Sequence, residues 1–409
     1  MQLLLKSPSS FKEIIRLPTS KSISNRVLVI NALAKSTSLP ACLSTCDDTR
    51  VMLEALMADK RMVNIGAAGT AMRFLTAYYA VTPGERILTG TERMRHRPIR
   101  VLVDALRSIG ADIDYVDQEG YPPLRIQGKP LTGSTIQLAG DVSSQYISAL
   151  LLIAPMLPNG LTVCLDGEII SRPYIDLTLS LMCDFGAQVS WKSASVIEVL
   201  PQPYRPISYT VESDWSAASY WYEMVALSAT GEVELKGLFK ESYQGDQAVS
   251  TLFESLGVAT HFTADGVVLK KTAVCCSSMN YNFIDQPDLA QTFVVCCALL
   301  QIPFRFTGLR SLKIKETDRI VALITEMQKM GYCLLEEDGG VLSWSGKRVV
   351  AENAIIFDTY EDHRMAMALA PASFCVDGIR INNPEVVSKS YPTYWDDLKK
   401  IGFHITKEL

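Results

Sequence analysis

The sequence predicts an α/β protein built from two domains, and a recurring local pattern is the main reason. Five times, an amphipathic helical segment ends in glycine and a short strand-like segment follows. These glycines are Gly110, Gly186, Gly257, Gly331 and Gly402, spaced by 76, 71, 74 and 71 residues. Such near-constant spacing indicates a duplicated unit. Glycine suits this place because a helix often ends in a residue of positive φ, where a Cβ atom would clash.

The repeat also sets the expected number of domains. A sixth unit should precede Gly110, and residues 51–57 do have a helical pattern. They are followed almost at once by Ile65 and Gly66, so this first unit is predicted to be abridged, with a strand pair missing. Six units of roughly 70 residues exceed one hydrophobic core, so we expect two domains of three units each. The proline-rich residues 201–206 lie near the seam between the third and fourth units.

Composition narrows the class of protein. With 48% hydrophobic and 20% charged residues, the chain resembles ordinary globular proteins. Residues 1–6 form too short an apolar run for a signal peptide and no later segment approaches a membrane span, so we expect a cytoplasmic protein that binds no membrane. The ten cysteines are scattered or adjacent in pairs, without zinc spacing, and predict reduced thiols and no metal site. We also expect a monomer, although the sequence does not settle the oligomeric state.

Charge points to small anionic ligands. The net charge of −5 argues against nucleic acid as a partner. Arginines are nevertheless dense in one place, at Arg93, Arg95, Arg97 and Arg100. Solvated surface arginines are the alternative explanation for this cluster.

Residues 19–26 form the clearest candidate anion site. Small hydroxyl residues precede an apolar, helix-like stretch at residues 27–34, which predicts a helix start with exposed backbone N–H groups and the positive end of the helix dipole. Lys21 adds a charge there, and Arg26, four residues after Ser22, is expected one turn along the same face. A plain capped helix with two solvated cations would give the same local pattern.

Three other segments combine small or hydroxyl residues with a following helical pattern. They are residues 66–73, which contain Gly69, residues 141–146, which contain Ser143, Ser144 and Gln145, and residues 171–174, which begin with Ser171. Close backbone approach and donors at a helix start suit a phosphate group. Tight helix packing or ordinary N-caps explain each segment equally well when it is taken alone.

Two segments near the C-terminus place carboxylates beside cations. Lys315 and Arg319 are four residues apart at the start of a predicted helix, and Glu316 lies beside them. A carboxyl group between cations is a candidate for proton transfer, and a surface ion-pair ladder is the alternative. Residues 362–368 similarly place Arg364 in the first turn of an apolar helix, and His363 has no partner at zinc spacing.

Together these segments resemble the signature segments of the 5-enolpyruvylshikimate-3-phosphate synthase family, which are enolpyruvyl transferases of the shikimate pathway. The similarity rests on residues 20–26 (SKSISNR), 68–73 (AGTAMR), 97–99 (RPI), 143–145 (SSQ), 315–319 (KETDR) and 362–366 (DHRMA), in this order. The resemblance spans nearly the whole chain.

The resemblance implies a two-domain inside-out α/β barrel of six βαβαββ repeats, three per domain, with the first abridged. The extreme N-terminus is expected to join the C-terminal half. The expected domains are residues 1–19 with 213–409, and an inserted domain of residues 20–212, with the active site in the cleft between them.

The resemblance also assigns site residues. Those expected to bind shikimate 3-phosphate are Lys21, Ser22, Arg26, Ser143, Ser144, Gln145, Ser171, Asp288 and Lys315. Those expected to bind phosphoenolpyruvate are Lys21, Gly69, Arg97, Gln145, Arg319, Arg364 and Lys389. Arginine forks suit the carboxylate and the phosphate of phosphoenolpyruvate.

The implied reaction joins these two anionic substrates and leads towards chorismate and the aromatic amino acids. We assign Asp288 as the base near the 5-hydroxyl, and Glu316, together with Lys21, as the acid towards C3 of phosphoenolpyruvate. No metal or organic cofactor is expected, because lysine and arginine cations can neutralise the tetrahedral intermediate.

Three positions depart from the family pattern. Ala67 replaces an asparagine, Phe74 replaces a proline and is expected to tilt the following helix, and Ser311 replaces an asparagine that binds the shikimate phosphate. None removes a charged catalytic group.

Two alternative functions differ from this one at specific residues. The UDP-N-acetylglucosamine enolpyruvyl transferases share the fold but carry a cysteine on a mobile loop, and residues 91–100 contain none. A non-catalytic relative that only binds anions would be expected to lack Asp288, Glu316 or Lys389, and all three are present.

Overall fold

The computed structural model describes residues 1–58 and 60–408. The chain folds into two compact units, one made of Met1–Pro18 with Glu212–Leu409 and the other of Thr19–Val211. Below they are called the discontinuous unit and the inserted unit. The backbone therefore passes from one unit to the other twice, after Pro18 and after Val211.

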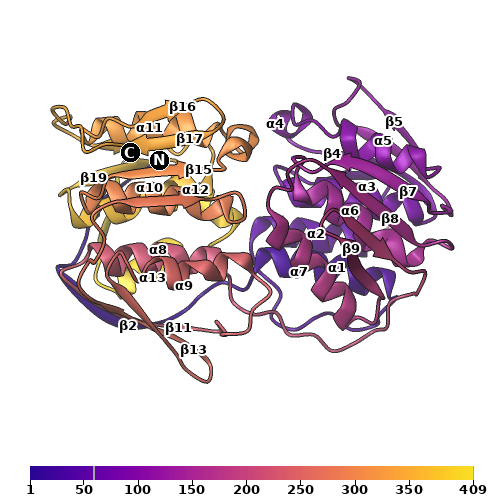
Figure 1. Ribbon diagram of the computed structural model, residues 1–409, viewed down its shortest axis with the longest axis horizontal. Coiled ribbons are helices and arrows are strands. Elements are labelled where there is room, and N and C mark those ends of the chain that lie inside the picture. Colours follow the sequence, from indigo (N-terminus) through magenta and orange to yellow (C-terminus); the bar gives the residue numbers. More distant parts are fainter. Residues whose placement is uncertain (59, 409) are drawn as a thin grey trace. The chain divides into compact units, whose positions relative to one another are not determined.

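Helices and sheets alternate along the inserted unit (Figure 1). Its first sheet has the order β3-β4-β6-β5, formed by β3 (Met62–Asn64), β4 (Gly84–Thr89), β6 (Leu124–Gly128) and β5 (Asp112–Tyr115). Its second has the order β7-β8-β10-β9, formed by β7 (Thr135–Ala139), β8 (Leu161–Asp166), β10 (Val196–Val199) and β9 (Val189–Ser193). Its helices are α1 (Lys21–Leu33), α2 (Asp47–Met57), α3 (Gly69–Val81), α4 (Glu92–Arg95), α5 (Arg100–Ser108), α6 (Ser144–Ile153) and α7 (Arg172–Asp184).

The discontinuous unit contains three sheets, each of four strands. Their orders are β12-β13-β11-β2, β14-β15-β17-β16 and β18-β19-β1-β20. The strands are β1 (Gln2–Lys6), β2 (Ser10–Arg16), β11 (Thr230–Lys236), β12 (Val258–Phe262), β13 (Gly266–Lys271), β14 (Met279–Asn282), β15 (Phe304–Thr307), β16 (Leu335–Glu337), β17 (Val341–Trp344), β18 (Ile356–Phe357), β19 (Ile379–Asn382) and β20 (His404–Glu408). The helices are α8 (Trp215–Leu227), α9 (Val249–Leu252), α10 (Ala290–Leu299), α11 (Arg319–Lys329), α12 (His363–Leu369) and α13 (Tyr394–Lys400).

Strand pairing is the same in all five sheets. One edge is a parallel pair, and the other two pairings are antiparallel. The N-terminal strands complete two sheets whose other members come from the C-terminal half. Strand β2 pairs in parallel with β11, and β1 lies between β19 and β20.

The segment before β3 is reduced compared with these units. It contains α1 and α2, and its strand pairing consists of one parallel bridge between Ala41 and Thr210. By contrast, the five glycines of the repeat pattern all have positive φ, between +82° and +101°. Four of them, Gly110, Gly186, Gly331 and Gly402, directly follow the C-cap of a helix as predicted, whereas Gly257 ends a series of turns that separates α9 from β12.

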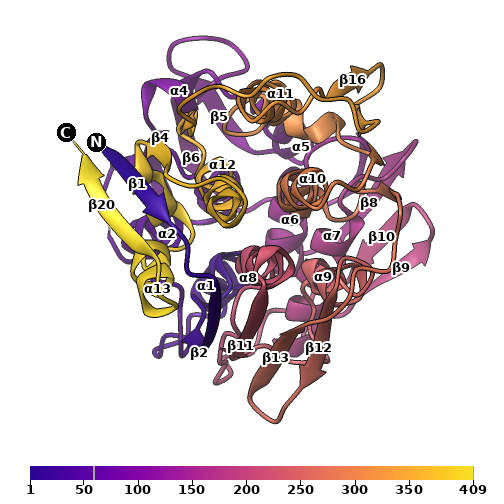
Figure 2. The ribbon, with the colours of Figure 1, turned by 90° about the vertical axis from the view of Figure 1, so that its left-hand side faces the viewer.

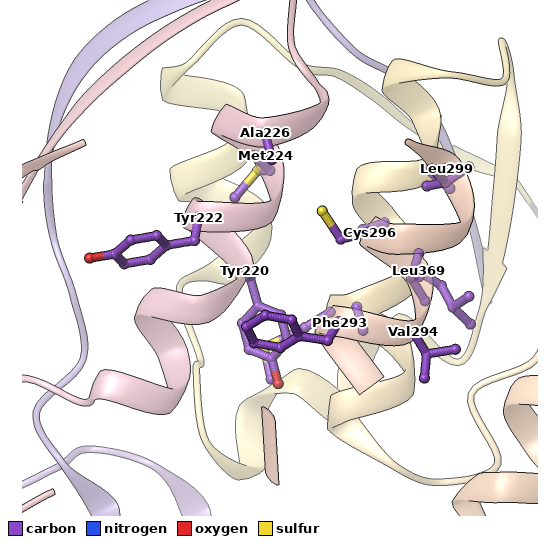
Figure 3. Close-up of a cluster of buried hydrophobic side chains, with 14 of the residues drawn as sticks. Tyr220, Tyr222, Met224, Ala226, Phe293, Val294, Cys296, Leu299 and Leu369 are labelled. Carbon is purple, nitrogen blue, oxygen red and sulfur yellow. The ribbon is translucent and has the colours of Figure 1, made fainter. Parts of the chain in front are cut away.

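Helices α8, α10 and α12 run alongside one another in the middle of the discontinuous unit, with the sheets outside them (Figures 1 and 2). Their facing sides are apolar: Tyr220, Phe293, Cys296 and Leu369 are among the buried side chains between them (Figure 3). Each of these helices is buried on most of its sides. Polar side chains at its N-terminus can therefore lie only at one end of the bundle.

Among the described residues, no helix is both long and apolar enough to cross a membrane.

Candidate active site

The residues predicted in the discontinuous unit form one network of ion pairs, and those predicted in the inserted unit lie in several smaller groups at helix starts. The network of the discontinuous unit is formed where α10, α11 and α12 begin. Asp288 lies in the short 3₁₀ turn Pro287–Leu289 just before α10, and its carboxylate is 2.9 Å from Arg364, 3.2 Å from Arg319 and 3.8 Å from Lys315. The structure thus gathers three of the predicted residues around the carboxylate of a fourth.

Glu316 extends the same network. Its two carboxylate oxygens lie 3.1 Å from Arg319 and 2.8 Å from Lys389. Lys389 ends the 3₁₀ segment Pro384–Lys389, which is far from Glu316 in the sequence. All six residues predicted in this unit therefore belong to one ion network.

Asp362, which was not predicted as a site residue, contacts both arginines of this network. It is fully buried and accepts hydrogen bonds from Arg319 at 2.7 and 3.3 Å. The same carboxylate caps α12 by accepting from the backbone N–H of Arg364 at 2.9 Å. One acidic side chain thus orients one arginine and fixes the helix that carries the other.

Formal charges in the network do not cancel. Among the described residues that these ion pairs join, the cations Lys315, Arg319, Arg364 and Lys389 outnumber the carboxylates Asp288, Glu316 and Asp362 by one. Arg319 and Arg364 are only 1% and 6% exposed, so their charges are weakly screened by water. An anion is therefore a favourable addition to this site.

The surrounding charges change the proton affinity of the carboxylate. Burial alone would raise the pKa of Asp288, but Arg364, Lys315 and Arg319 outweigh it and hold that pKa well below its ordinary value. Burial lowers the pKa of Lys315, and the neighbouring Asp288 opposes that shift. Asp288 is consequently ionised at neutral pH.

Helix α8 supplies further contacts to Arg364. The guanidinium donates hydrogen bonds to the Tyr220 hydroxyl at 3.4 Å and to the Ser216 hydroxyl at 3.3 Å. Burial is the main reason that the pKa of Tyr220 is raised to about 12, so this hydroxyl stays protonated. Neither residue was singled out from the sequence, because nothing in the local pattern of α8 distinguishes them from core residues.

In the inserted unit, α1 begins as the sequence predicts. Ser20 is its N-cap and accepts a hydrogen bond from the N–H of Ile23 at 3.3 Å. Lys21 is the first helical residue, and its ammonium group lies 3.3 Å from the carboxylate of Asp48, which is buried near the start of α2. Asp48 is another residue that the sequence reasoning missed.

Arg26 lies one turn after Ser22 on α1, as expected, and its guanidinium is engaged by groups of the protein. It is only 3% exposed and donates to Thr178, Ser148 and the backbone carbonyls of Ser22 and Tyr174, at 2.7 to 3.2 Å. Burial lowers its pKa to about 10, so it remains charged at neutral pH. Arg26 therefore ties α1 to α6 and α7, and its contact with shikimate 3-phosphate stays a prediction.

Phe74 packs beneath Arg26, with the guanidinium carbon 5.3 Å from the ring centroid. The helix α3 that contains it runs without interruption from Gly69 to Val81. The departure at this position thus supplies an aromatic face to a buried cation.

Gly69, the first residue of α3, lies directly beneath Arg97. A Cβ atom on Gly69 would be 2.9 Å from an Arg97 guanidinium nitrogen and 3.3 Å from one of Arg73. The side chain of Gln145, at the start of α6, donates to the Thr70 hydroxyl at 3.4 Å. Three residues predicted to bind phosphoenolpyruvate are thus connected with the start of α3.

The predicted serines occupy helix starts, and Ser22 directly follows Lys21 in the first turn of α1. Ser143 is the N-cap of α6 and accepts from the N–H of Gln145, and Ser144 is the first residue of that helix. Ser171 precedes α7 with φ +55°, a left-handed conformation that is uncommon for residues other than glycine. Such backbone strain is found most often at functional sites.

Comparison with known proteins agrees with these observations. The family model of EPSP synthase (3-phosphoshikimate 1-carboxyvinyltransferase) matches residues 55–398. A 3-phosphoshikimate 1-carboxyvinyltransferase of Bacteroides fragilis is 60% identical, covering 99% of each chain. One of Shewanella halifaxensis is 35% identical, covering 98% of this chain and 99% of the relative.

The solved EPSP synthase of Acinetobacter baumannii is similar in fold, with a TM-score of 0.76 at 19% identity. The match covers 99% of this chain and all of that one. The α/β class predicted from the sequence is thereby confirmed. On the family model and the two sequence relatives, this chain belongs to the EPSP synthase family of 3-phosphoshikimate 1-carboxyvinyltransferases.

Proposed function

We infer that this enzyme transfers the enolpyruvyl group of phosphoenolpyruvate to the 5-hydroxyl of shikimate 3-phosphate and releases phosphate. This is the shikimate-pathway reaction that leads to chorismate and the aromatic amino acids. Family membership supports the reaction, and the placing of Asp288 among Arg319, Arg364 and Lys315 is the observation that supports the residue roles.

Phosphoenolpyruvate is assigned to the cations and helix starts of both units. Arg319, Arg364 and Lys389 supply charge from the discontinuous unit, where the ion network carries one excess positive charge. The inserted unit supplies Lys21, Gly69, Arg97 and Gln145. Two anionic groups on one small substrate can satisfy several guanidinium groups at once.

Shikimate 3-phosphate is assigned to Lys21, Ser22, Arg26, Ser143, Ser144, Gln145, Ser171, Asp288 and Lys315. Hydroxyl groups and backbone N–H groups at the starts of α6 and α7 suit its phosphate. The guanidinium of Arg26 also donates to Thr178 and Ser148, so its contact with the substrate would add to or replace bonds that already hold it.

In the proposed mechanism, Asp288 takes the proton of the 5-hydroxyl as the oxygen attacks C2 of phosphoenolpyruvate. Glu316, with Lys21, delivers a proton to C3, which gives a tetrahedral intermediate. Loss of a proton from C3 and departure of phosphate from C2 then restore the double bond. The lysine and arginine cations neutralise the negative charge carried by the intermediate.

Substrate binding is expected to tune the base. In the structure the cations hold the pKa of Asp288 well below its ordinary value, which makes it a weak base. When the carboxylate and phosphate of phosphoenolpyruvate share Arg319 and Arg364, less positive charge acts on Asp288 and its pKa rises. The base thus becomes stronger only when the second substrate is bound.

The proposed architecture is the inside-out α/β barrel pair of six βαβαββ repeats, with the first repeat abridged. Five sheets with one shared strand order support five of the repeats. The lone bridge between Ala41 and Thr210 is what the abridged unit would retain. We propose residues 1–19 with 213–409 and residues 20–212 as the two domains, and the cleft between them as the active site.

We also propose that the enzyme acts as a monomer in the cytoplasm. All ten cysteines are unpaired, which suits a reducing compartment.

Phosphate release by the purified protein tests the reaction. Release should require both substrates and cease when either is omitted. Release from phosphoenolpyruvate alone, at an undiminished rate, would contradict the proposed transfer.

Substitution of the two carboxylates tests the mechanism. Asp288→Asn and Glu316→Gln should each lower kcat by about 10²–10⁴-fold, the usual contribution of acid–base catalysis. Asp338→Asn and Glu352→Gln, at exposed positions, are the controls. Asp288→Asn should bind shikimate 3-phosphate within an order of magnitude of the unsubstituted enzyme, and Glu316→Gln should also slow exchange of the C3 hydrogens with solvent. A Glu316→Gln enzyme with normal turnover and exchange would move the acid role to Lys21.

A further inference from the structure

We propose that the hydroxyl group of Tyr146, together with Arg73, positions Arg97 for phosphoenolpyruvate by holding the carbonyl group of Pro98. The proposal rests on the proposed function, which assigns Arg97 to phosphoenolpyruvate. It concerns two residues to which no role was assigned from the sequence.

The carbonyl oxygen of Pro98 is held by side chains from two different helices. The Tyr146 hydroxyl on α6 donates to it at 2.6 Å, and a guanidinium nitrogen of Arg73 on α3 donates to it at 3.3 Å. Both side chains are buried, at 8% and 4% exposure, and the guanidinium carbon of Arg73 lies 5.7 Å from the Tyr146 ring centroid. Pro98 itself is exposed, so two buried side chains hold a surface segment at one atom.

Pro98 directly follows Arg97, and this makes the anchor effective. The proline ring fixes its own φ, and the residue before a proline is confined to extended conformations. Holding the Pro98 carbonyl therefore also restricts the backbone of Arg97. On the other side, the N–H of Arg97 donates to the carbonyl of Met94 at 3.1 Å, and the N–H of Ile99 donates to that of Gly120 at 2.9 Å.

Arg73 connects this anchor to the proposed binding surface. Its guanidinium also donates to the carbonyl of Gly69 at 3.2 Å and contacts the sulfur of Met94 at 3.7 Å. Arg73 thus contacts the first turn of α3, helix α4 and the Pro98 carbonyl at the same time. The Arg97 guanidinium lies over Gly69 within this frame.

Residues 93–97 need such an anchor because repulsion between their arginines opposes a single ordered conformation. Arg93 and Arg95 are exposed and Arg97 is partly exposed, within five consecutive positions. Like charges this close repel one another, more so before an anion binds. Without the anchor, the segment would become ordered only when phosphoenolpyruvate binds. The conformational entropy lost in this ordering would weaken the binding.

The test is Tyr146→Phe, which removes one hydroxyl and keeps the ring. Its matched control is Tyr204→Phe, because the buried Tyr204 hydroxyl likewise donates to a backbone carbonyl, that of Leu152 on α6, at 2.9 Å. Losing one such hydrogen bond corresponds to a change of about 3- to 10-fold. Tyr146→Phe should raise KM for phosphoenolpyruvate by this factor and leave the dissociation constant of shikimate 3-phosphate unchanged. Tyr204→Phe should change neither, although both variants lose similar thermal stability.

A double-mutant cycle separates positioning of Arg97 from general damage to α6. In an Arg97→Ala enzyme, the added Tyr146→Phe change should no longer affect phosphoenolpyruvate. In a Gln145→Ala enzyme, the effect of Tyr146→Phe should persist in full. Arg73→Lys, which keeps a charge but cannot span Gly69, Met94 and Pro98 together, should reproduce the effect of Tyr146→Phe.

The outcomes distinguish this proposal from the proposed function. If Arg97→Ala leaves phosphoenolpyruvate binding unchanged, the assignment of Arg97 is wrong. If Arg97→Ala weakens it but Tyr146→Phe does not, or if the two tyrosine variants behave alike, only the positioning role of Tyr146 is overturned.

Discussion

At the residue scale, the lack of a side chain at Gly69 determines where the Arg97 guanidinium can lie. As the first residue of α3, it allows the Arg97 guanidinium to lie directly on the helix start. A Cβ atom at position 69 would be too close to the Arg97 guanidinium. The absence of a side chain at Gly69 therefore controls where this guanidinium lies, and not the stability of α3.

Gly69→Ala should therefore weaken phosphoenolpyruvate binding and leave the fold intact. The new methyl group would lie 2.9 Å from Arg97 and 3.3 Å from Arg73, and both contacts are with the ends of flexible side chains. We expect about a 10-fold rise in KM for phosphoenolpyruvate, equivalent to about 1.4 kcal/mol. Thermal melting and shikimate 3-phosphate binding should stay close to those of the unsubstituted enzyme. An equal weakening of both ligands would contradict the assignment of Gly69.

Glu223 is a second residue with a testable property, the raised pKa of its buried carboxyl group. It lies on α8 in the core, fully buried, and neither carboxylate oxygen has a hydrogen-bond partner among the described residues. Burial raises its pKa well above the ordinary value, which favours the protonated form in the fold. The titratable groups whose pKa it influences are Cys296, Cys297, Cys375 and Tyr394.

Glu223→Gln should remove a loss of stability at high pH. With a raised folded-state pKa, the stabilising effect of the protonated form is fully present below the unfolded pKa of about 4.3 and is lost as pH rises through the folded pKa. Between those values this group lowers the free energy of unfolding by about 1.4 kcal/mol per pH unit. The melting temperature of Glu223→Gln should gain on the unsubstituted protein as pH rises from 5 to 9, whereas exposed Glu352→Gln should not. A difference that is constant across this range would show that Glu223 is ionised in the fold.

At the scale of elements, the starts of helices carry most of the candidate site. Lys21, Gly69, Ser144 and Arg319 are each the first residue of a helix. Helix starts expose N–H groups that an anion can satisfy, and their dipoles favour negative charge. In the discontinuous unit, α11 is capped by Asp318 and α12 by Asp362, and these two caps differ in a way that can be measured.

Asp362→Asn should be more damaging than Asp318→Asn. Both aspartates cap helices, α12 and α11, and asparagine is as good a cap as aspartate, so the caps should survive. Only Asp362 also pairs with the buried Arg319. Removing one partner of a buried ion pair costs about 3 kcal/mol, whereas Asp318→Asn should change the free energy of unfolding by less than about 0.5 kcal/mol.

Denaturant unfolding and phosphoenolpyruvate binding would measure the two effects. Asp362→Asn should weaken phosphoenolpyruvate as well, because Arg319 loses its orienting partner. Equal unfolding energies for the two variants would mean that Arg319 is held sufficiently by Asp288 and Glu316.

At the scale of the whole molecule, the proposed ligands are divided between the two units. Lys21, Arg97 and Ser143 belong to the inserted unit, and Asp288, Arg319 and Arg364 belong to the discontinuous unit. We therefore expect domain closure to assemble the active site. Cations on separate units repel one another when the units approach, and anions that bind to both units would remove this repulsion.

Solution scattering should detect the closure. The radius of gyration should fall when shikimate 3-phosphate and a non-reacting anionic analogue of phosphoenolpyruvate are both present. Chloride at high concentration is the control for simple screening, which acts on exposed charges without bridging the units. An unchanged radius with both ligands bound would contradict closure.

The sequence by itself determined the local structure and the chemistry available to it. Glycine after the end of four helices, the serine cap of α1 and the helix that follows this cap depend on neighbours a few residues away, and each was predicted correctly. The residue types of the candidate site were also readable, because cations and carboxylates stand in short, recognisable segments.

Only the tertiary structure decided which of these groups meet. Strand β2 pairs with β11, more than 200 residues later, and Glu316 meets Lys389 across 73 positions. The burial of Arg26, the clamp of Asp362 on Arg319 and the hydroxyl of Tyr146 on Pro98 are likewise contacts between separate elements. A local pattern fixes backbone conformation through nearby atoms, but the partner of a side chain depends on how distant elements pack, and no spacing in the sequence records that.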